Sequence, residues 1–149
     1  MKKILSIIVF FVFTGCGFKP IFSSSDTNFS INKIDYNGQH EKIINNNLRN
    51  YLNKGNKKFN YNLIIESKEN KLTTLKDKRG DPVNFKLTID VSLTVLENDK
   101  VKIEKAYQQT FNYNNTSKKF ELSKYEKEIK NSMLNKISEE IIVSLYSIQ

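Results

Sequence analysis

The clearest pattern in the chain is a long alternation of apolar and polar residues in 85–95. An alternation with period two over this length predicts a half-buried antiparallel strand. Residues 97–100 are typical of a hairpin turn, and a further strand follows with an apolar face that Lys105 and Gln109 interrupt. We therefore expect the middle of that face to be partly exposed or bulged. The two apolar faces consist of Phe85, Leu87, Ile89, Val91, Leu93 and Val95, and of Val101, Ile103, Tyr107, Phe111 and Tyr113.

The residues before this pair predict three earlier elements. A first strand is expected over 29–36, and a helix over 39–54 with Gly55 as its C-terminal cap. A second strand is expected from Tyr61, and the pattern leaves open whether it continues as far as Leu75. The turn that follows is expected over 76–84. It contains Pro82, which has no N–H for a β-ladder.

The C-terminal residues predict an amphipathic helix over about 123–147. Apolar residues recur there at a spacing of four and form one stripe. The opposite, polar face is expected to carry Lys127, Lys130, Asn131 and Glu139. The stripe consists of Tyr125, Ile129, Met133, Ile137, Ile141 and Leu145, widened by Leu134, Ile142 and Ile148.

The predicted order is β-α-β-β-β-α, and each element has one apolar face. The economical arrangement is an α+β, two-layer sandwich in which both helices pack on one face of a four-stranded sheet. We expect residues 29–149 to form this single domain. The other face of the sheet is rich in Thr, Ser, Lys and Asp, which makes it a candidate binding surface.

The first sixteen residues are typical of an export signal. Lys2 and Lys3 precede an apolar run of about ten residues, about half of what a membrane-spanning helix needs. Thr14 and Gly15 then lead to Cys16. This stretch resembles the lipobox of bacterial lipoproteins, although Phe13 stands where that pattern prefers Leu. The resemblance implies removal of residues 1–15, a lipid on Cys16 and a tether over 16–28. The alternative is an ordinary signal peptide that contains a cysteine by chance.

Charge and composition narrow the classes of partner. The chain of 149 residues has 24 Lys and Arg against 16 Asp and Glu; without Lys2 and Lys3 the balance is 22 − 16 = +6. In an envelope compartment the natural partners for this charge are lipid phosphates and phosphorylated glycolipids. Export argues against nucleic acid. Cys16 and His40 are single residues of their type, so neither a disulfide, a metal site nor a cofactor is expected.

Several short motifs, in order, resemble the LPS-assembly lipoprotein family, LptE. They begin with Cys16-Gly17-Phe18-Lys19-Pro20-Ile21-Phe22 and continue with Gly38-Gln39 and Leu48-Arg49-Asn50. Phe111-Asn112-Tyr113-Asn114, followed by Ser117, Phe120 and a long helix, completes the set. The C-terminal helix departs from the family pattern. It is rich in Lys, Asn and Ser, whereas the branch of the family with this N-terminal motif often has a helix rich in Ala and Arg.

The resemblance implies a partner and a ligand. Such a protein sits inside an LptD-like outer-membrane β-barrel, helps the barrel to assemble, and takes part in lipopolysaccharide transport. Gly17 rather than Asp after the cysteine implies sorting to the outer membrane. Lys76, Lys78 and Arg79, with Lys86 on the next strand, are the residues expected to bind lipopolysaccharide phosphates. The alternative for this cluster is a solvated loop of ordinary charge.

Two other classes of function stay open. One is an outer-membrane lipoprotein that serves as chaperone or pilot for a different barrel or secretion protein. The other is a small periplasmic hydrolase, which the residues support least. The chain has one histidine, no Gly-x-Ser-x-Gly elbow, and Asp90 has no base near it in the sequence. We therefore expect no enzyme activity.

Overall fold

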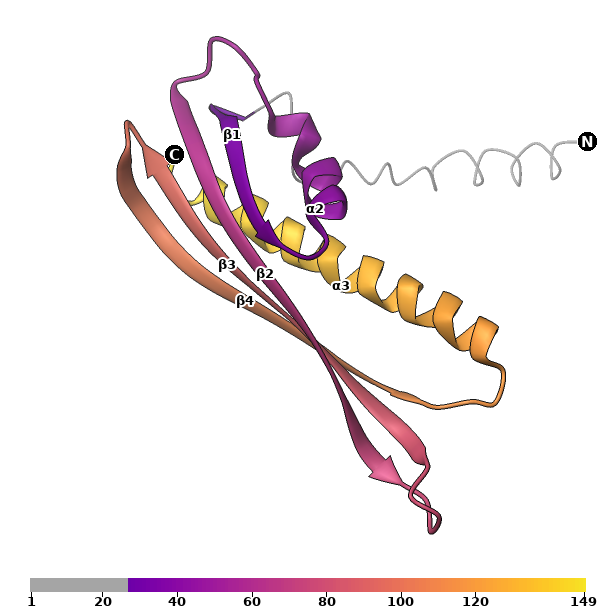
Figure 1. The fold of residues 1–149 in the computed structure, drawn as a ribbon. Helices are drawn as coiled ribbons and strands as arrows, with labels where there is room; N and C mark the ends of the chain where they lie inside the picture. The colour runs from indigo at the N-terminus through magenta and orange to yellow at the C-terminus, as the bar shows by residue number, and fades with distance from the viewer. Residues whose placement is uncertain (1–26) are drawn as a thin grey trace, which may run out of the picture.

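The computed structural model describes residues 27–149, which form a sheet covered on one face by two helices (Figure 1). The order is β1 (Phe29–Gly38), α2 (Glu41–Leu48), a short 3₁₀ helix η3 (Arg49–Tyr51), β2 (Phe59–Lys76), β3 (Pro82–Glu97), β4 (Lys100–Asn114) and α3 (Lys119–Tyr146). The α+β, two-layer architecture and the order of its elements agree with the prediction. The predicted signal peptide and lipid attachment site lie outside the described residues.

The four strands are arranged in the order in which they occur in the chain. β1 runs parallel to β2, which the helical connection between them requires, and the other two pairs are antiparallel. β1 pairs with only the first half of β2, from Phe59 to Ser67. β2 and β3 pair along almost their whole length, to Lys76 opposite Pro82. The sheet is therefore four strands wide at one end and narrower at the other.

One apolar core fills the space between the sheet and the helices. The apolar face of β3 predicted from the alternation is the centre of this core, from Leu87 to Val95. Ile44 and Leu48 of α2 and the stripe of α3 from Ile129 to Leu145 close it from above. Tyr125, the first residue of the predicted stripe, is largely exposed and touches Tyr113 only edge to face. None of the helices formed by residues 27–149 has the length and apolarity needed to cross a membrane.

The first helix is shorter than expected, and its predicted cap is wrong. The expected helix continued to Lys54, but α2 ends at Leu48 and Leu52 forms a bridge with Ile31 of β1. Three consecutive asparagines, residues 45–47, lower the helix propensity just before that end. Asn53 and Asn56, not Gly55, take the left-handed conformation that reverses the chain.

The open question about β2 is settled, and the prediction for Pro82 is wrong. β2 continues past Leu75 to Lys76, and its pairing with β3 is irregular on both sides of Leu75. Pro82 is the first residue of β3 rather than part of the loop. The first position of a strand tolerates a residue that has no N–H to donate. The turn between the strands is accordingly short, residues 77–81, and α3 begins at Lys119, four residues earlier than expected.

Gly38 has a structural reason to be glycine. Its φ of +118° is a conformation that other residues rarely adopt. A Cβ atom built on it would lie 2.2 Å from the backbone oxygen of Ser67. β1 therefore ends here by close contact with β2, and the chain turns into α2.

Candidate functional site: the projecting hairpin and the open sheet face

The distal half of the β2–β3 hairpin extends beyond the helices. Because β1 ends at Gly38, opposite Ser67, the residues of β2 from Lys68 onward have β3 as their only sheet neighbour. Figure 1 shows this hairpin twisting away from the body of the domain, past the start of α3. We call residues 68–86 the hairpin arm.

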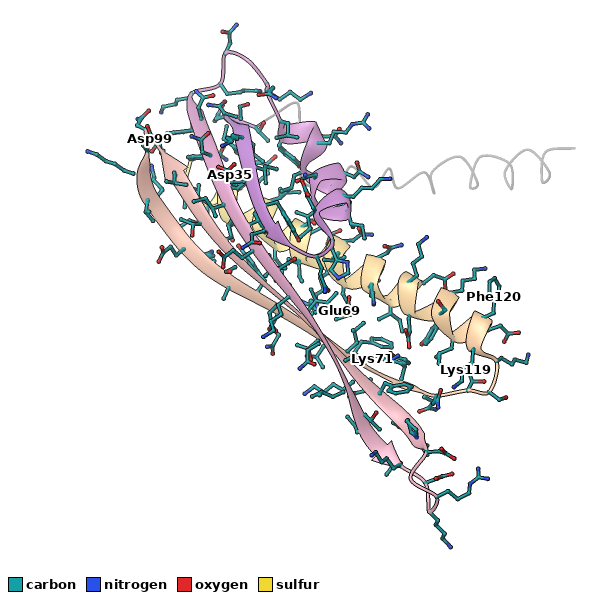
Figure 2. All side chains as sticks on the ribbon, in the orientation of Figure 1. Asp35, Glu69, Lys71, Asp99, Lys119 and Phe120 are labelled. Atoms are coloured by element: carbon teal, nitrogen blue, oxygen red, sulfur yellow. The ribbon has the colours of Figure 1, made fainter. Side chains whose placement is uncertain are left out.

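Polar contacts connect the base of the hairpin arm to α3, beside Phe85, which packs partly buried against the core. Lys71 Nζ lies 2.5 Å from Glu126 Oε1, and the Tyr113 hydroxyl donates to the same carboxylate oxygen at 2.8 Å. The Lys71 ammonium group also lies over the Phe85 ring, 4.2 Å from its centroid. Lys71 therefore joins β2, β3, β4 and α3 at one point, beneath α3 in Figure 2.

A second cluster of polar side chains, centred on Glu69 of β2, lies next to the contacts of Lys71. One carboxylate oxygen is 2.5 Å from Lys130 Nζ of α3, and the other is 2.7 Å from His40 Nε2 at the start of α2. Lys130, which was predicted on the polar face opposite the apolar stripe, therefore reaches the sheet instead. His40 is the residue just before the first turn of α2, and its ring is half-buried against Glu69.

The electrostatics of this junction favour the charged form of Glu126. Burial raises the pKa of its carboxyl group, but hydrogen bonds from Lys71 and Tyr113 outweigh that effect and hold the pKa below its usual range. The pKa of Tyr113 is raised, first by burial and then by its bond to Glu126. Tyr113 therefore stays a hydrogen-bond donor at neutral pH, and the junction is a fixed ion pair with a neutral phenol.

The tip of the hairpin arm is held by an aspartate. Asp77 Oδ1 accepts hydrogen bonds from the backbone N–H groups of Arg79 and Asp81, at 2.8 and 2.9 Å. These two bonds, that from Asp81 first, lower the pKa of Asp77. The Arg79 guanidinium reaches Asp77 at 3.5 Å and Asp81 at 3.6 Å. Arg79 is thus shared with two carboxylates, a feature that counting only the basic residues of the turn misses.

The four residues predicted to bind phosphate lie at two places on the hairpin arm. Lys76, Lys78 and Arg79 are exposed at the tip. Lys86 is half-buried on the sheet face away from the helices, where the register places it opposite Leu72. Residues 76–81, the end of β2 and the turn after it, carry three basic and two acidic side chains. The arrangement therefore offers exposed ammonium groups at the tip and one further ammonium group beside an apolar side chain.

Exposed apolar side chains are the feature of this end that sequence reasoning missed. Leu72 is 52% and Leu75 54% exposed, and Phe120, at the start of α3, is 85% exposed and points away from the sheet in Figure 2. Among the described residues, nine large apolar side chains are exposed, and six of them belong to this end: Leu72, Leu75, Val83, Phe111, Phe120 and Tyr125. Ammonium groups among exposed leucines and aromatics fit a ligand with both phosphate groups and hydrocarbon.

The uncovered face of the sheet is polar, as predicted. It contains a hollow of about 480 Å³ whose lining includes Asn37, Glu66, Lys68, Asp90 and Gln108. The Gln108 amide donates to Asp90 at 2.6 Å, so this aspartate is a partner in a cross-strand pair between β3 and β4. No group of three or more His, Cys, Asp or Glu residues within 27–149 could hold a metal ion. The face suits hydrogen bonding to another polar surface.

The interruptions in the apolar face of β4 have partners on α3. Lys105 Nζ donates to Ser144 Oγ at 3.0 Å, and the Gln109 amide donates to Glu140 at 3.1 Å. The Tyr107 hydroxyl between them also donates to Ser144, at 2.7 Å. The middle of this face is partly exposed, as expected. Its polar side chains connect the edge strand β4 to α3 by hydrogen bonds.

No family model and no curated protein matches the sequence. Solved structures do share its fold. Rare lipoprotein B from Shewanella oneidensis is 14% identical with a TM-score of 0.60, over 78% of this chain and 95% of that one. A minor lipoprotein from Acinetobacter baumannii is 12% identical with a TM-score of 0.61, over 79% and 91%. Lipoprotein B from Nitrosomonas europaea is 14% identical with a TM-score of 0.59, over 88% and 91%. These likenesses establish the fold.

Proposed function

We propose that this chain is an outer-membrane lipoprotein of the LptE type, attached to the membrane by a lipid on Cys16. It sits within an LptD-like β-barrel, helps the barrel to assemble and takes part in lipopolysaccharide transport. The observation that carries the proposal is the fold that more than three quarters of this chain shares with solved bacterial lipoproteins. The lipobox-like sequence before Cys16 supports the same assignment.

The open sheet face supports a role inside a barrel. Its side chains along β3 and β4 are mostly polar: Thr88, Asp90 and Ser92 lie opposite Thr110, Gln108 and Ala106. Such a face forms hydrogen bonds with a polar lumen and does not need to be covered by hydrocarbon. The apolar face of the same sheet is already occupied by α2 and α3. The domain can therefore plug a water-filled barrel without losing its own core.

The hairpin arm supports lipopolysaccharide as ligand. Lipid A presents phosphate groups next to acyl chains, and the arm presents Lys76, Lys78 and Lys86 next to Leu72 and Leu75. Arg79 contributes less to phosphate binding than its charge suggests, because Asp77 and Asp81 already contact its guanidinium group.

A pull-down of the acylated protein from outer membranes tests the main proposal. We expect a large outer-membrane β-barrel to co-purify, and recovery of no barrel would overturn the proposal. Recovery of a different barrel or a secretion channel would support the chaperone or pilot alternative. A Cys16→Ala variant is the control: it should lose membrane localisation and keep its fold, because residues 27–149 form the core without it.

Charge reversal on the hairpin arm tests the ligand. Lys76→Glu with Lys78→Glu should weaken lipopolysaccharide binding at least ten-fold, since two phosphate contacts of roughly 1.5 kcal/mol each are lost. Arg79→Glu alone should have a smaller effect. Lys42→Glu, on the exposed side of α2, is the matched control that should leave binding unchanged. Unchanged binding in the Lys76 and Lys78 variant would remove the arm from the ligand site.

A further inference from the structure

A second basic surface lies at the opposite end of the domain from the hairpin arm. Residues 49–58 contain Arg49, Lys54, Lys57 and Lys58, and no Asp or Glu. Arg49, Lys54 and Lys58 are exposed, and Lys57 is half-buried. We call these four residues the basic end. They carry four positive charges within ten residues, more concentrated than the mixed charges of the hairpin turn.

Hydrogen bonds hold the loop of the basic end against the first residues of β1. Asn53 donates its N–H to the Ile31 oxygen at 2.9 Å, and Lys54 donates its N–H to Ser30 Oγ at 2.8 Å. Phe59 donates to the backbone oxygen of Asn28 at 3.0 Å. The loop is therefore held against the first residues of β1. A lipid on Cys16 would attach on this side, because Thr27 and Asn28 connect β1 to the preceding residues.

The turn between β3 and β4, next to the basic end, adds no net charge of its own. The β3–β4 turn at the same end of the sheet contains Glu97 and Asp99 together with Lys100 and Lys102, so its side chains contribute no net charge. Glu97 is paired with Lys102 at 2.6 Å. Lys58 and Lys102 lie over the Phe59 ring, 5.1 and 5.8 Å from its centroid. The side chains of this turn therefore add no net negative charge beside Arg49, Lys54 and Lys58.

The two ends lie farther apart than the connection to Cys16 can reach. Eleven residues, from Cys16 to Asp26, span at most about 40 Å when fully extended. β2 has 18 residues, and at about 3.3 Å per residue it extends nearly 60 Å from the basic end to the tip of the arm. A lipid at Cys16 thus keeps the basic end near the membrane surface, although the connection alone does not fix how the domain is oriented.

We propose that the basic end binds the headgroups of anionic phospholipids and orients the domain with its hairpin arm pointing away from that surface. This inference rests on the lipid attachment at Cys16 in the proposed function. Exposed charges distributed over a helix end and a loop suit a flat surface of many headgroups better than one enclosed anion. Each Lys or Arg near an anionic membrane contributes about a five-fold increase in partitioning, so three or four of them are sufficient to select one orientation.

Vesicle sedimentation tests the proposal without the lipid anchor. The protein is the chain from residue 16 carrying Cys16→Ala, and the vesicles contain equal parts of phosphatidylcholine and phosphatidylglycerol, with no lipopolysaccharide. We expect binding to these vesicles and none to pure phosphatidylcholine. The triple variant Arg49→Gln, Lys54→Gln, Lys58→Gln should reduce partitioning about 100-fold. Added salt should reduce the binding of the unsubstituted protein, because it screens exposed charges.

The matched control neutralises the same number of exposed charges on α3. Lys124→Gln, Lys127→Gln, Lys136→Gln should bind the anionic vesicles as the unsubstituted protein does. Equal losses in the two triple variants, or equal binding to neutral vesicles, would overturn the proposal. Circular dichroism of each variant verifies that it is folded. Since the vesicles contain neither lipopolysaccharide nor a barrel, failure here is distinct from failure of the pull-down that tests the proposed function.

Discussion

The two ends of the same strands, β2 and β3, have opposite characters. At the basic end β2 lies between β1 and β3 under a helical layer, and Phe29, Tyr61 and Leu63 are fully buried. In the hairpin arm β2 no longer pairs with β1, and Leu72 and Leu75 are exposed. One pair of strands thus supplies both the stable core and a projecting surface. The difference arises at Gly38, where β1 ends against Ser67.

The residues that stabilise the fold and the residues proposed to bind a ligand thus lie at opposite ends of these strands. The buried end has aromatic side chains packed on one another, with Phe29 stacked on Tyr51 at 5.6 Å and edge to face with Tyr146 at 5.3 Å. The arm is instead attached to α3 by the ion pairs of Lys71 and Lys130. Apolar burial stabilises a domain far more than exposed or half-exposed ion pairs do. Substitutions should therefore differ in effect according to the end at which they lie.

The largest effect is expected for Phe29→Ala at the buried end. Phe29 is fully buried against three aromatic residues, so its truncation should cost about 3–5 kcal/mol of the free energy of unfolding. Urea denaturation measures this change. Leu75→Ala, on the exposed arm, is the matched control. A loss below about 1 kcal/mol for Phe29→Ala would mean that the packed core does not extend to this end.

The next largest effect is expected for Gly38→Ala, at the boundary between the two regions. The new methyl group would meet the Ser67 oxygen, and φ is positive, so we expect a loss of about 1–3 kcal/mol. Gly55→Ala is the control, because nothing lies within 4 Å of its Cβ position and its φ is outside the left-handed region. Equal stability of the two variants in thermal denaturation would contradict the close contact that ends β1.

A smaller effect is expected for Glu126→Gln at the junction of the arm and α3. The variant loses the ion pair with Lys71, and we expect a cost of about 1 kcal/mol at neutral pH. Because the folded-state pKa of Glu126 is lowered, its contribution is complete above the ordinary pKa of about 4.3 and is lost as pH falls through the folded-state value. Unfolding measured between neutral and acidic pH should therefore show the two proteins converging in acid. A stability difference that stays constant over this range would contradict the prediction.

The smallest effect on stability is expected for Leu72→Ser with Leu75→Ser on the arm. Both side chains are about half exposed, so the free energy of unfolding should change by less than about 1 kcal/mol. Lipopolysaccharide binding should nevertheless weaken, because the hydrocarbon contacts are lost. A large loss of stability in urea denaturation would show that the arm belongs to the core.

The sequence predicted the parts of the fold that depend on a local period. The alternation from Phe85 to Val95 was sufficient to predict a half-buried antiparallel strand, and the stripe from Ile129 to Leu145 was sufficient to predict a helix packed on the sheet. The end of α2 was not predictable in this way, because it depends on Leu52 pairing with Ile31, a residue of another element. Tertiary contacts override local propensity at such positions.

The proposed ligand surface on the hairpin arm was predictable only as a list of charges. The sequence indicated Lys76, Lys78 and Arg79, but the contacts of Arg79 with Asp77 and Asp81 required the geometry of the turn. Lys130 was assigned to solvent because its partner, Glu69, is sixty-one residues earlier. The exposure of Leu72 and Leu75 depends on where β1 ends, which the pattern within β2 does not contain. The basic end likewise becomes a surface only when the fold brings its loop to the start of β1.

Crosslinking in living cells from one position at each end tests the central claim most directly. A photoreactive residue at Arg79 should crosslink to lipopolysaccharide or a large outer-membrane β-barrel. The same residue at Asn56, between Lys54 and Lys58, should crosslink to phospholipid. The same partner at both positions, or neither a barrel nor lipopolysaccharide at Arg79, would contradict the assignment of separate roles to the two ends.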